Sequence, residues 1–317
     1  MISNLNVLMT GASGFVGSHL LKRMERRQGL RVRAAVRRFS GVSSCSMVHV
    51  GNIEQHTDWS NALNEQDVVV HAAALAHVTD NDTEESLTVF RRVNVDGTLN
   101  LAREAADSGV QRFIFISSIG VNGNNNTLPF TEDDQPNPTG AYAQSKWEAE
   151  LGLGAIGRET GMEIVIVRPP LVYGPNAPGN FGSLVRMIEK GIPLPLGAIH
   201  NKRSLVSLDN LVDLIMTCID HPAAANQVFL ASDGQDVSTT ELLRGVGRAM
   251  GKPARLIPVP AGMLMFGASL LGKKAVAQRL LGSLQVDISK ARNVLGWEPP
   301  LSVEKGLRRC FFSENEC

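Results

Sequence analysis

A tyrosine and a lysine stand four residues apart in the segment Tyr142-Ala-Gln-Ser-Lys146. The segment has a helical pattern, so this spacing places both side chains on one helix face. A phenol has a pKa of about 10, and a neighbouring ammonium lowers it. Such a pair can exchange a proton with a carbonyl or alcohol oxygen while a nicotinamide carries the hydride. The same spacing also occurs in ordinary amphipathic helices, where the tyrosine packs and the lysine is solvated.

Two serines, Ser117 and Ser118, end the apolar run that precedes this segment. A hydroxyl at that place can hydrogen-bond both a substrate oxygen and the tyrosine. A serine at the end of a strand, followed by Tyr142 and Lys146 on the next helix, is more specific than either feature alone. The sequence therefore predicts an active site at the end of this strand.

A glycine-rich segment, Thr10-Gly11-Ala12-Ser13-Gly14-Phe15-Val16-Gly17, follows the first apolar run and opens a helical pattern. Glycine allows a tight turn, a close approach of the backbone to a pyrophosphate, and close packing of helix on strand. The helix start then offers free N–H groups and a positive dipole end. In this context the segment indicates a dinucleotide-binding loop rather than a merely structural turn. The residues expected to contact the cofactor here are Gly11, Ser13, Gly14, Phe15, Val16 and Gly17.

Two arginines, Arg37 and Arg38, follow Val36 at the end of the second predicted strand. NAD-binding enzymes usually carry Asp or Glu about 20 residues after the loop, where the carboxylate binds the ribose diol. A guanidinium at this place suits a 2′-phosphate instead. The sequence therefore favours NADP(H) and leaves NAD(H) open. The alternative is that both arginines are solvated surface charges.

The elements that must position these residues alternate between apolar runs and helical patterns. Strands are expected at Asn6–Met9, Arg31–Val36, Met47–Val50, Asp67–Ala72, Arg112–Ser117, Glu163–Val167 and Gln227–Ala231. Helices are expected at Gly14–Arg27, from Asp58, in a long stretch ending near Ser108, and at Ala141–Glu159. Strands that are apolar on both faces and alternate with helices predict an α/β fold with a Rossmann-type doubly wound parallel sheet.

The second half of the chain changes character. A helix follows Asp209, and Ser238-Thr-Thr-Glu241 is a capping box that opens a helix ending at Gly251. These segments predict a smaller C-terminal substrate-binding lobe over the carboxyl edge of the sheet, where open α/β sheets bind ligands. We expect residues 1–172 to form the dinucleotide-binding domain and 203–231 to return to it. Residues 173–202 and 232–317 would form the smaller lobe.

Composition narrows the class of protein. The 317 residues include 31 Lys+Arg and 31 Asp+Glu, and this zero net charge argues against a nucleic-acid partner. Four scattered cysteines without a C-x-x-C pair predict no metal site and fit a reducing compartment. The N-terminus lacks the features of a signal peptide, so we expect a cytoplasmic protein.

The longest apolar run, Ala261–Gly272, ends at Lys273 and Lys274 and is too short for an integral membrane span. We interpret it as a buried core helix. Contact of this helix with a membrane surface is the alternative.

Together these motifs resemble the extended short-chain dehydrogenases/reductases, and among them the nucleotide-sugar enzymes of the NAD-dependent epimerase/dehydratase family. The resemblance covers nearly the whole chain. Besides the glycine loop and the tyrosine–lysine pair, it includes His71-Ala-Ala-Ala74, Asn94-Val-Asp-Gly-Thr98, Phe115–Ser118, Arg168-Pro-Pro-Leu-Val-Tyr-Gly-Pro175 and Gly296-Trp-Glu-Pro299.

This resemblance implies roles for single residues. Ser118, rather than Ser117, would supply the catalytic hydroxyl beside Tyr142 and Lys146, and Asn94 would support the active-site helix. The cofactor would also be contacted by Asn52 and Ile53 beside the adenine, by Ala72 and Ala73 beneath it, and by Ala74, Asn94 and Pro169.

On the substrate side, the resemblance implies that Asn180 and Arg203 bind the diphosphate of a UDP-sugar. Alternatively, Arg203 forms a surface salt bridge and Asn180 caps the next helix. The resemblance also implies a homodimer, packed through the long helix before Ser108 and the Tyr142 helix.

The type of reaction follows from one departure. Sugar 4,6-dehydratases of this family carry an Asp-Glu pair after the catalytic hydroxyl, but Ile119 and Gly120 stand there and cannot move a proton. With 4,6-dehydration disfavoured, the remaining reaction of this family is hydride transfer at carbon 4 alone. Arg37 and Arg38 favour a reductase that converts UDP-4-keto-6-deoxy-N-acetylglucosamine to UDP-N-acetylquinovosamine for surface polysaccharide. The alternative is a UDP-glucose or UDP-N-acetylglucosamine 4-epimerase with retained NAD.

Two other classes of protein are less consistent with the residues. A non-catalytic scaffold of this fold would typically lose the tyrosine or the lysine, and this chain keeps both. A reductase of small or flavonoid-like ketones would not need a diphosphate site, which Asn180 and Arg203 would supply.

Overall fold

The main sheet holds seven parallel strands in the order β3-β2-β1-β4-β5-β6-β9. A computed structural model describes residues 4–38, 45–76, 84–272 and 274–312. The strands are β1 Leu5–Thr10, β2 Leu30–Val36, β3 Ser46–His49, β4 Val68–His71, β5 Arg112–Ile116, β6 Glu163–Arg168 and β9 Val228–Leu230. The strand order reverses between β1 and β4, which is where such sheets bind ligands. The predicted Rossmann-type sheet is confirmed.

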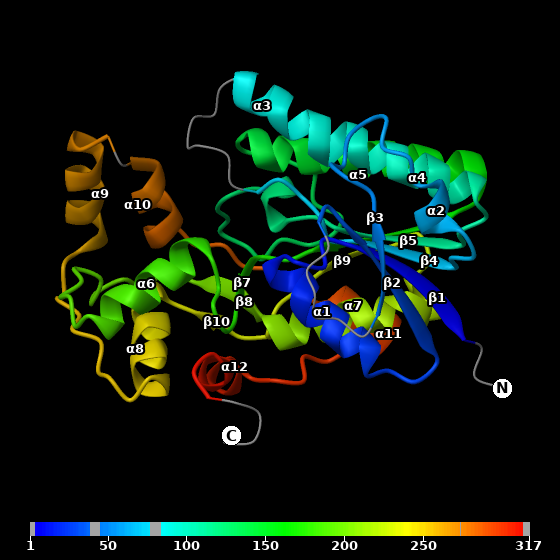
Figure 1. Ribbon diagram of the computed structural model, residues 1–317. Helices are drawn as coiled ribbons and strands as arrows, with labels where there is room; N and C mark the ends of the chain where they lie inside the picture. Colours follow the sequence, from blue (N-terminus) through cyan, green and yellow to red (C-terminus); the bar gives the residue numbers. More distant parts are fainter. Residues whose placement is uncertain (1–3, 39–44, 77–83, 273, 313–317) are drawn as a thin grey trace.

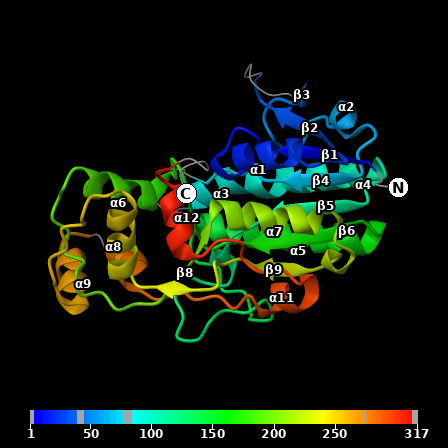
Figure 2. The same cartoon turned by 90° about the horizontal axis from the view of Figure 1, so that it is seen from below.

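Successive residues of each central strand face two separate hydrophobic cores. In β1, Val7 and Met9 pack into one core, whereas Leu8 between them packs into the other. The first core is covered by α1 (Phe15–Glu25), α7 (Leu208–Asp220) and α11 (Ser289–Leu295), which Figure 2 shows across one face of the sheet. The second is covered by α2 (Ser60–Leu63), α4 (Thr98–Asp107) and α5 (Ala141–Thr160). Burial on both faces explains why these strands are apolar throughout.

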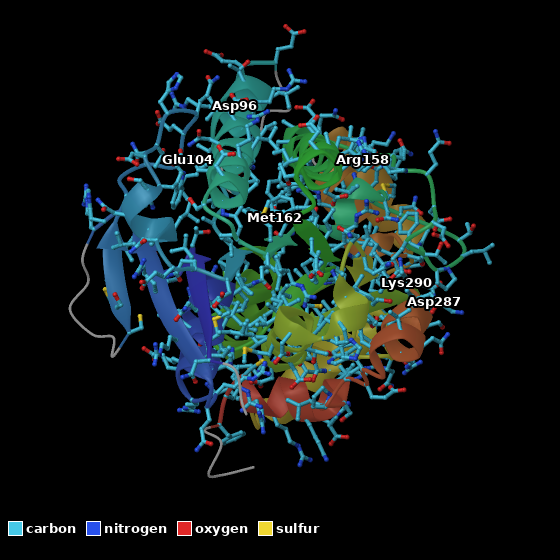
Figure 3. All side chains as sticks on the ribbon, turned by 90° about the vertical axis from the view of Figure 1, so that its right-hand side faces the viewer. Asp96, Glu104, Arg158, Met162, Asp287 and Lys290 are labelled. Atoms are coloured by element: carbon cyan, nitrogen blue, oxygen red, sulfur yellow. The ribbon has the colours of Figure 1, made fainter. Side chains whose placement is uncertain are left out.

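The predicted long helix ending near Ser108 contains a π-helical insertion. It begins as α3 (Glu84–Phe90), continues as the π-helix η1 (Arg91–Gly97) and ends as α4. It runs beside α5 along the top of Figure 1, and Figure 3 shows Glu104 of α4 and Arg158 of α5 on neighbouring helices. A π-turn widens a helix locally and often marks a functional site. Here it carries Asn94.

The smaller lobe is built on a three-stranded sheet of order β10-β8-β7. Its strands are β7 Leu171–Tyr173, β8 Arg203–Ser207 and β10 Asp236–Val237, and its helices are α6 Gly179–Glu189, α8 Thr239–Ala249, α9 Ala261–Leu270, α10 Lys274–Leu281 and α12 Val303–Arg309. The capping box predicted at Ser238 and Glu241 is present and opens α8. Apolar residues of α6, α8 and α12 fill the core of this lobe.

The interpretation of the apolar run as a buried core helix is wrong. Helix α9 has no buried residue, and Met263, Phe266 and Leu270 are 66%, 69% and 73% exposed. Other helices already fill the core of the lobe, so α9 is left at its outer edge, on the left of Figure 1. Within the described part of the chain, no helix combines the length and hydropathy needed to cross a bilayer.

Candidate active site

The glycine loop between β1 and α1 makes close backbone contacts that exclude other residues. Gly11 has a φ of +75°, and a Cβ added there would lie 2.6 Å from the carbonyl carbon of Ala72. A Cβ on Gly17 would lie 2.0 Å from the carbonyl oxygen of Gly11. The loop is closed by the N–H of Gly14, which donates to Gly11 over 2.9 Å. The first N–H groups of α1 have no intrahelical acceptor, so this open turn fits the phosphates of a dinucleotide.

The two candidate serines have different surroundings. The Ser117 hydroxyl is buried and donates to the carboxylate of Glu150. Ser118 is half-buried, and its Oγ accepts the N–H of Gly120 over 3.1 Å. A Cβ added to Gly120 would lie 3.2 Å from Cβ of Ala143, which follows Tyr142 in α5. The structure thus places the turn that follows Ser118 against the first turn of α5, whereas the Ser117 hydroxyl is bound to Glu150.

Lys146 lies one turn after Tyr142 in α5, and its ammonium group is buried. The residue is 1% exposed, and Nζ donates to the carbonyl oxygen of Ile116 over 2.8 Å at the end of β5. Nζ also lies 4.2 Å from the centroid of the Phe115 ring. Burial lowers the pKa of Lys146 to about 7, although the charge of Glu150 opposes this effect. The lysine is therefore fixed between β5 and α5.

The phenol of Tyr142 is less acidic than the sequence led us to expect. Its ring packs edge-on against Phe90, with 5.9 Å between the ring centroids. Burial raises the pKa of Tyr142 to about 12. The expectation that the neighbouring lysine lowers this pKa is wrong for the protein alone. The reason is that burial raises the pKa of the phenol more than Lys146 lowers it, because the amine of Lys146 has a lowered pKa itself and donates to Ile116.

A buried ion pair joins α5 to the end of β6. The guanidinium of Arg168 lies 2.5 Å from the carboxylate of Glu150, and their side chains are 4% and 2% exposed. Arg168 also donates to Oδ1 of Asn122 over 2.9 Å, and Glu150 accepts the Ser117 hydroxyl. Sequence reasoning assigned no role to Glu150. Its spacing of four from Lys146, itself four from Tyr142, was the available signal, because such residues share one helix face.

Asn94 connects the π-helix, the segment after β4 and α5. Its amide donates to the Ser145 hydroxyl over 3.1 Å and to the Leu75 carbonyl over 3.0 Å, and its Oδ1 accepts the Leu75 N–H over 2.8 Å. Ser145 in turn donates to the Tyr142 carbonyl over 2.8 Å. These contacts support the proposal that Asn94 holds the helix of Tyr142 in place.

His71, at the end of β4, belongs to the segment His71-Ala-Ala-Ala74, but the sequence predicted no role for its side chain. Its ring nitrogens contact the hydroxyls of Thr10 over 2.7 Å and Thr98 over 3.0 Å. Burial, together with the charge of Lys146, lowers the pKa of His71 to about 3. The Thr10 hydroxyl also accepts the N–H of Ala73 over 3.3 Å. This neutral histidine therefore fixes the glycine loop against β4 and α4.

The remaining residues expected at the cofactor lie around this edge of the sheet. Ala72 and Ala73 are half-buried beside Gly11, whereas Ala74 is exposed. Ile53 is half-buried and Asn52 exposed. Pro169 is buried, and its carbonyl accepts the N–H of Ile119 over 2.9 Å. Arg37 and Arg38 are exposed directly after β2.

The two residues expected to bind a diphosphate lie in the smaller lobe. Arg203 begins β8 and donates through Nη1 to the carbonyl oxygens of Arg279 over 2.7 Å and Gly282 over 3.1 Å. Burial lowers its pKa. Among the described residues no carboxylate pairs with it, so the salt-bridge alternative finds no partner there. Asn180 is exposed in the first turn of α6, whose N-cap is Pro178.

Comparison with known proteins decides the family. Residues 7–231 match the profile of the NAD dependent epimerase/dehydratase family. The chain belongs to this family. It is 49% identical over 307 residues to the UDP-glucose 4-epimerase of Vibrio cholerae, covering 96% of this chain and 94% of that protein. It is 29% identical to the N-acetyl-alpha-D-glucosaminyl-diphospho-ditrans,octacis-undecaprenol 4-epimerase of Escherichia coli O157:H7, covering 96% and 94% of the two chains.

Solved structures agree with the fold of this epimerase/dehydratase family member. The UDP-N-acetylglucosamine 4-epimerase of Bacillus cereus superposes with a TM-score of 0.79 at 20% identity, covering 96% of this chain and 98% of that one. The UDP-glucose 4-epimerase of Thermotoga maritima, solved with UDP-glucose, has a TM-score of 0.77 at 24% identity, covering 96% and 97%.

The family is NAD-dependent, and the glycine loop has the geometry that a dinucleotide needs. The two named relatives are epimerases, not 4-keto reductases. These relatives favour the 4-epimerase, which the sequence analysis kept as the alternative, over the 4-keto reductase that the sequence analysis preferred.

Proposed function

We propose that this protein is an NAD-dependent 4-epimerase of a UDP-sugar. The observation that carries the proposal is 49% identity, over 96% of the chain, to the Vibrio cholerae UDP-glucose 4-epimerase. The placement of Ser118 after β5, of Lys146 against the end of β5, and of Tyr142 one turn before Lys146 in α5 supports it, because proton transfer needs these groups beside the cofactor.

In this proposal the chain's own residues handle the proton at the oxygen on carbon 4. The Ser118 hydroxyl hydrogen-bonds that oxygen, and Tyr142 accepts its proton and later returns it. NAD, when bound, supplies the hydride acceptor and, in oxidised form, a positive charge. Such a charge favours the phenolate, so the pKa of Tyr142 falls from about 12 when cofactor is present. Lys146 is placed to bind the nicotinamide ribose, and Asn94 and Ser145 position the helix.

The residues after Ser118 support epimerisation over dehydration. Ile119 is buried and Gly120 has no side chain, so neither can protonate the hydroxyl that leaves carbon 6 or take the proton from carbon 5. A sugar held here can exchange hydride at carbon 4 but finds no acid–base pair for the loss of water.

The test is conversion of UDP-glucose or UDP-N-acetylglucosamine without added cofactor. We expect the purified protein to form the C4 epimer, detected by NMR. In D₂O the product should carry no deuterium at carbon 4, because an internally returned hydride does not exchange with solvent. Absence of product without cofactor, or solvent deuterium at carbon 4, would overturn the proposal.

A second candidate is the reductase of UDP-4-keto-6-deoxy-N-acetylglucosamine, which forms UDP-N-acetylquinovosamine. The observation that favours it is Arg37 and Arg38, both exposed after β2 where an acidic residue would bind the ribose diol of NAD. This reaction consumes NADPH in stoichiometric amounts. Loss of one NADPH per product, faster than with NADH and slowed by Arg37→Asp, would support the reductase.

Substrate binding by Arg203 and Asn180 is also proposed. Arg203→Leu should raise the dissociation constant for UDP, measured by calorimetry, at least about tenfold, because a charge-assisted contact is lost. The exposed Arg308 of α12 offers a control, because Arg308→Leu removes the same charge elsewhere in the lobe. Equal UDP affinity in both variants would exclude the assignment of Arg203.

We further propose a homodimer packed through α3–α4 and α5. Leu151 of α5 is 53% exposed, so this face has apolar surface to cover. Light scattering of the wild type and Leu151→Glu tests this: a dimer that the substitution splits supports the interface, and a monomeric wild type refutes it. We also propose that the smaller lobe comprises residues 173–202 and 232–317 together with β7 and β8. The sequence had placed β8 (Arg203–Ser207) in the dinucleotide-binding domain, but this strand pairs with β7 and β10.

A further inference from the structure

The outer edge of the smaller lobe has an exposed apolar surface. It is formed by α9 and α10, two consecutive helices that pack against each other (Figure 1). Every residue of α9 is at least partly exposed, and the helix carries no charged side chain. The large apolar side chains exposed on this hairpin and on the segment before it are Ile257, Met263, Phe266, Leu270, Leu271 and Val276. Most exposed large hydrophobic residues of the described chain therefore lie in one short stretch.

The charges on the chain segment that forms this surface all have one sign. Between Glu241 and Asp287 the sequence contains no acidic residue, although Asp+Glu equal Lys+Arg over the whole chain. Lys252 and Arg255 are exposed before α9, and Lys274 and Arg279 are exposed on α10. An apolar helix flanked by basic side chains has the two features that bind a protein to an anionic lipid surface.

We propose that the α9–α10 hairpin docks this protein on the surface of an anionic phospholipid bilayer. Helix α9 has ten residues, about 15 Å at 1.5 Å per residue, and cannot cross a hydrocarbon core of about 30 Å. It therefore lies in the plane of the interface, with Met263, Phe266 and Leu270 among the acyl chains and the basic residues at the headgroups.

A second copy of the chain fits this surface less well than a bilayer. In a twofold interface the same patch meets itself, so the basic residues of one copy would be brought together with those of the other, namely Lys252, Arg255, Lys274 and Arg279. Such like charges repel, and the segment offers no acidic residue to compensate. An anionic bilayer can bury the apolar side chains among its acyl chains and attract the basic side chains to its headgroups.

Docking would orient the proposed substrate site. The guanidinium of Arg203 donates to carbonyls of Arg279 and Gly282, at the end of α10. The hairpin thus contacts the proposed diphosphate-binding arginine directly. The docking itself does not rest on the proposed reaction and is tested without substrate.

The experiment is co-sedimentation of the full-length protein with vesicles of phosphatidylglycerol and phosphatidylcholine, or of phosphatidylcholine alone. We expect binding to the anionic vesicles that weakens as salt increases. The variant Met263→Ser/Phe266→Ser/Leu270→Ser should lose at least about tenfold of the partition coefficient, because three apolar side chains no longer insert. Lys252→Glu/Lys274→Glu should lose binding to anionic vesicles only.

The matched control is Leu128→Ser, since Leu128 is 78% exposed but lies outside the hairpin. It should bind as the wild type does, and circular dichroism should be the same for all variants. Absence of binding to anionic vesicles, or unchanged binding of the triple variant, would overturn the proposal. Wild-type self-association that the triple variant abolishes, without vesicle binding, would assign this face to a second copy instead.

Discussion

Replacing Glu150 with Gln tests whether the buried ion pair holds the site together. The carboxylate of Glu150 lies 2.5 Å from Arg168, and both side chains are almost fully buried. It also accepts the Ser117 hydroxyl next to Ser118. Glutamine keeps the shape of the side chain but leaves the Arg168 guanidinium charged and buried without a carboxylate. The substitution should therefore destabilise the protein rather than merely weaken one contact.

The expected magnitude follows from burial. Removing one partner of a buried pair costs about 3–5 kcal/mol, because the remaining charge stays desolvated. A domain has only about 5–15 kcal/mol of stability in total. The control is Glu304→Gln in α12, whose pair with Arg308 has the same chemistry but side chains 72% and 61% exposed. Exposed pairs of this spacing contribute about 0.3–0.5 kcal/mol.

The assay is urea unfolding of the wild type and both variants, followed by circular dichroism at pH 7. We expect Glu150→Gln to lose several kcal/mol in the free energy of unfolding and Glu304→Gln to lose less than about 1 kcal/mol. A loss from Glu150→Gln no larger than that from Glu304→Gln would refute the reasoning, since burial would then not decide the contribution of the pair.

Two further predictions concern the cofactor edge. His71 is buried and neutral with a folded pKa of about 3, so the unfolded chain binds its proton first as pH falls below 6.5. This group should therefore lower the free energy of unfolding by about 5 kcal/mol between pH 6.5 and 3. Urea unfolding of wild type and His71→Gln over this pH range should show that change as a pH-dependent difference between their free energies of unfolding. A pH-independent difference would contradict the prediction. Gly17→Ala should abolish NAD binding measured by calorimetry, because its Cβ would meet the Gly11 carbonyl, whereas Gly267→Ala in α9 has open space and should bind NAD as the wild type does. Normal NAD affinity in Gly17→Ala would show that the loop does not need this approach.

The main sheet could be predicted because its strands are buried on both faces. Residues such as Val7, Leu8 and Met9 must all be apolar when each face packs against helices, so the strand appears as a continuous run. The glycine loop and the capping box at Ser238 were equally predictable, because their chemistry is local. Local signals of this kind do not depend on knowing which segments meet in space.

The features that the sequence missed depend on distant contacts. The choice of Ser118 over Ser117 came from the family resemblance alone, because the carboxylate that accepts the Ser117 hydroxyl belongs to Glu150, far away in sequence. The raised pKa of Tyr142 depends on burial that neighbouring residues in sequence do not reveal. Helix α9 was misjudged because an apolar helix has the same composition whether it fills a core or lies exposed at an edge. Only the packing of the other helices decides between these outcomes.

The central claim is that the phenol of Tyr142 exchanges the proton while hydride moves at carbon 4. The most direct measurement is kcat for UDP-sugar epimerisation by Tyr142→Phe, with circular dichroism and NAD binding as checks that the protein is folded. Loss of a general acid–base group should lower kcat at least about 100-fold while NAD still binds. A folded Tyr142→Phe protein that binds NAD and keeps the wild-type kcat would contradict the account.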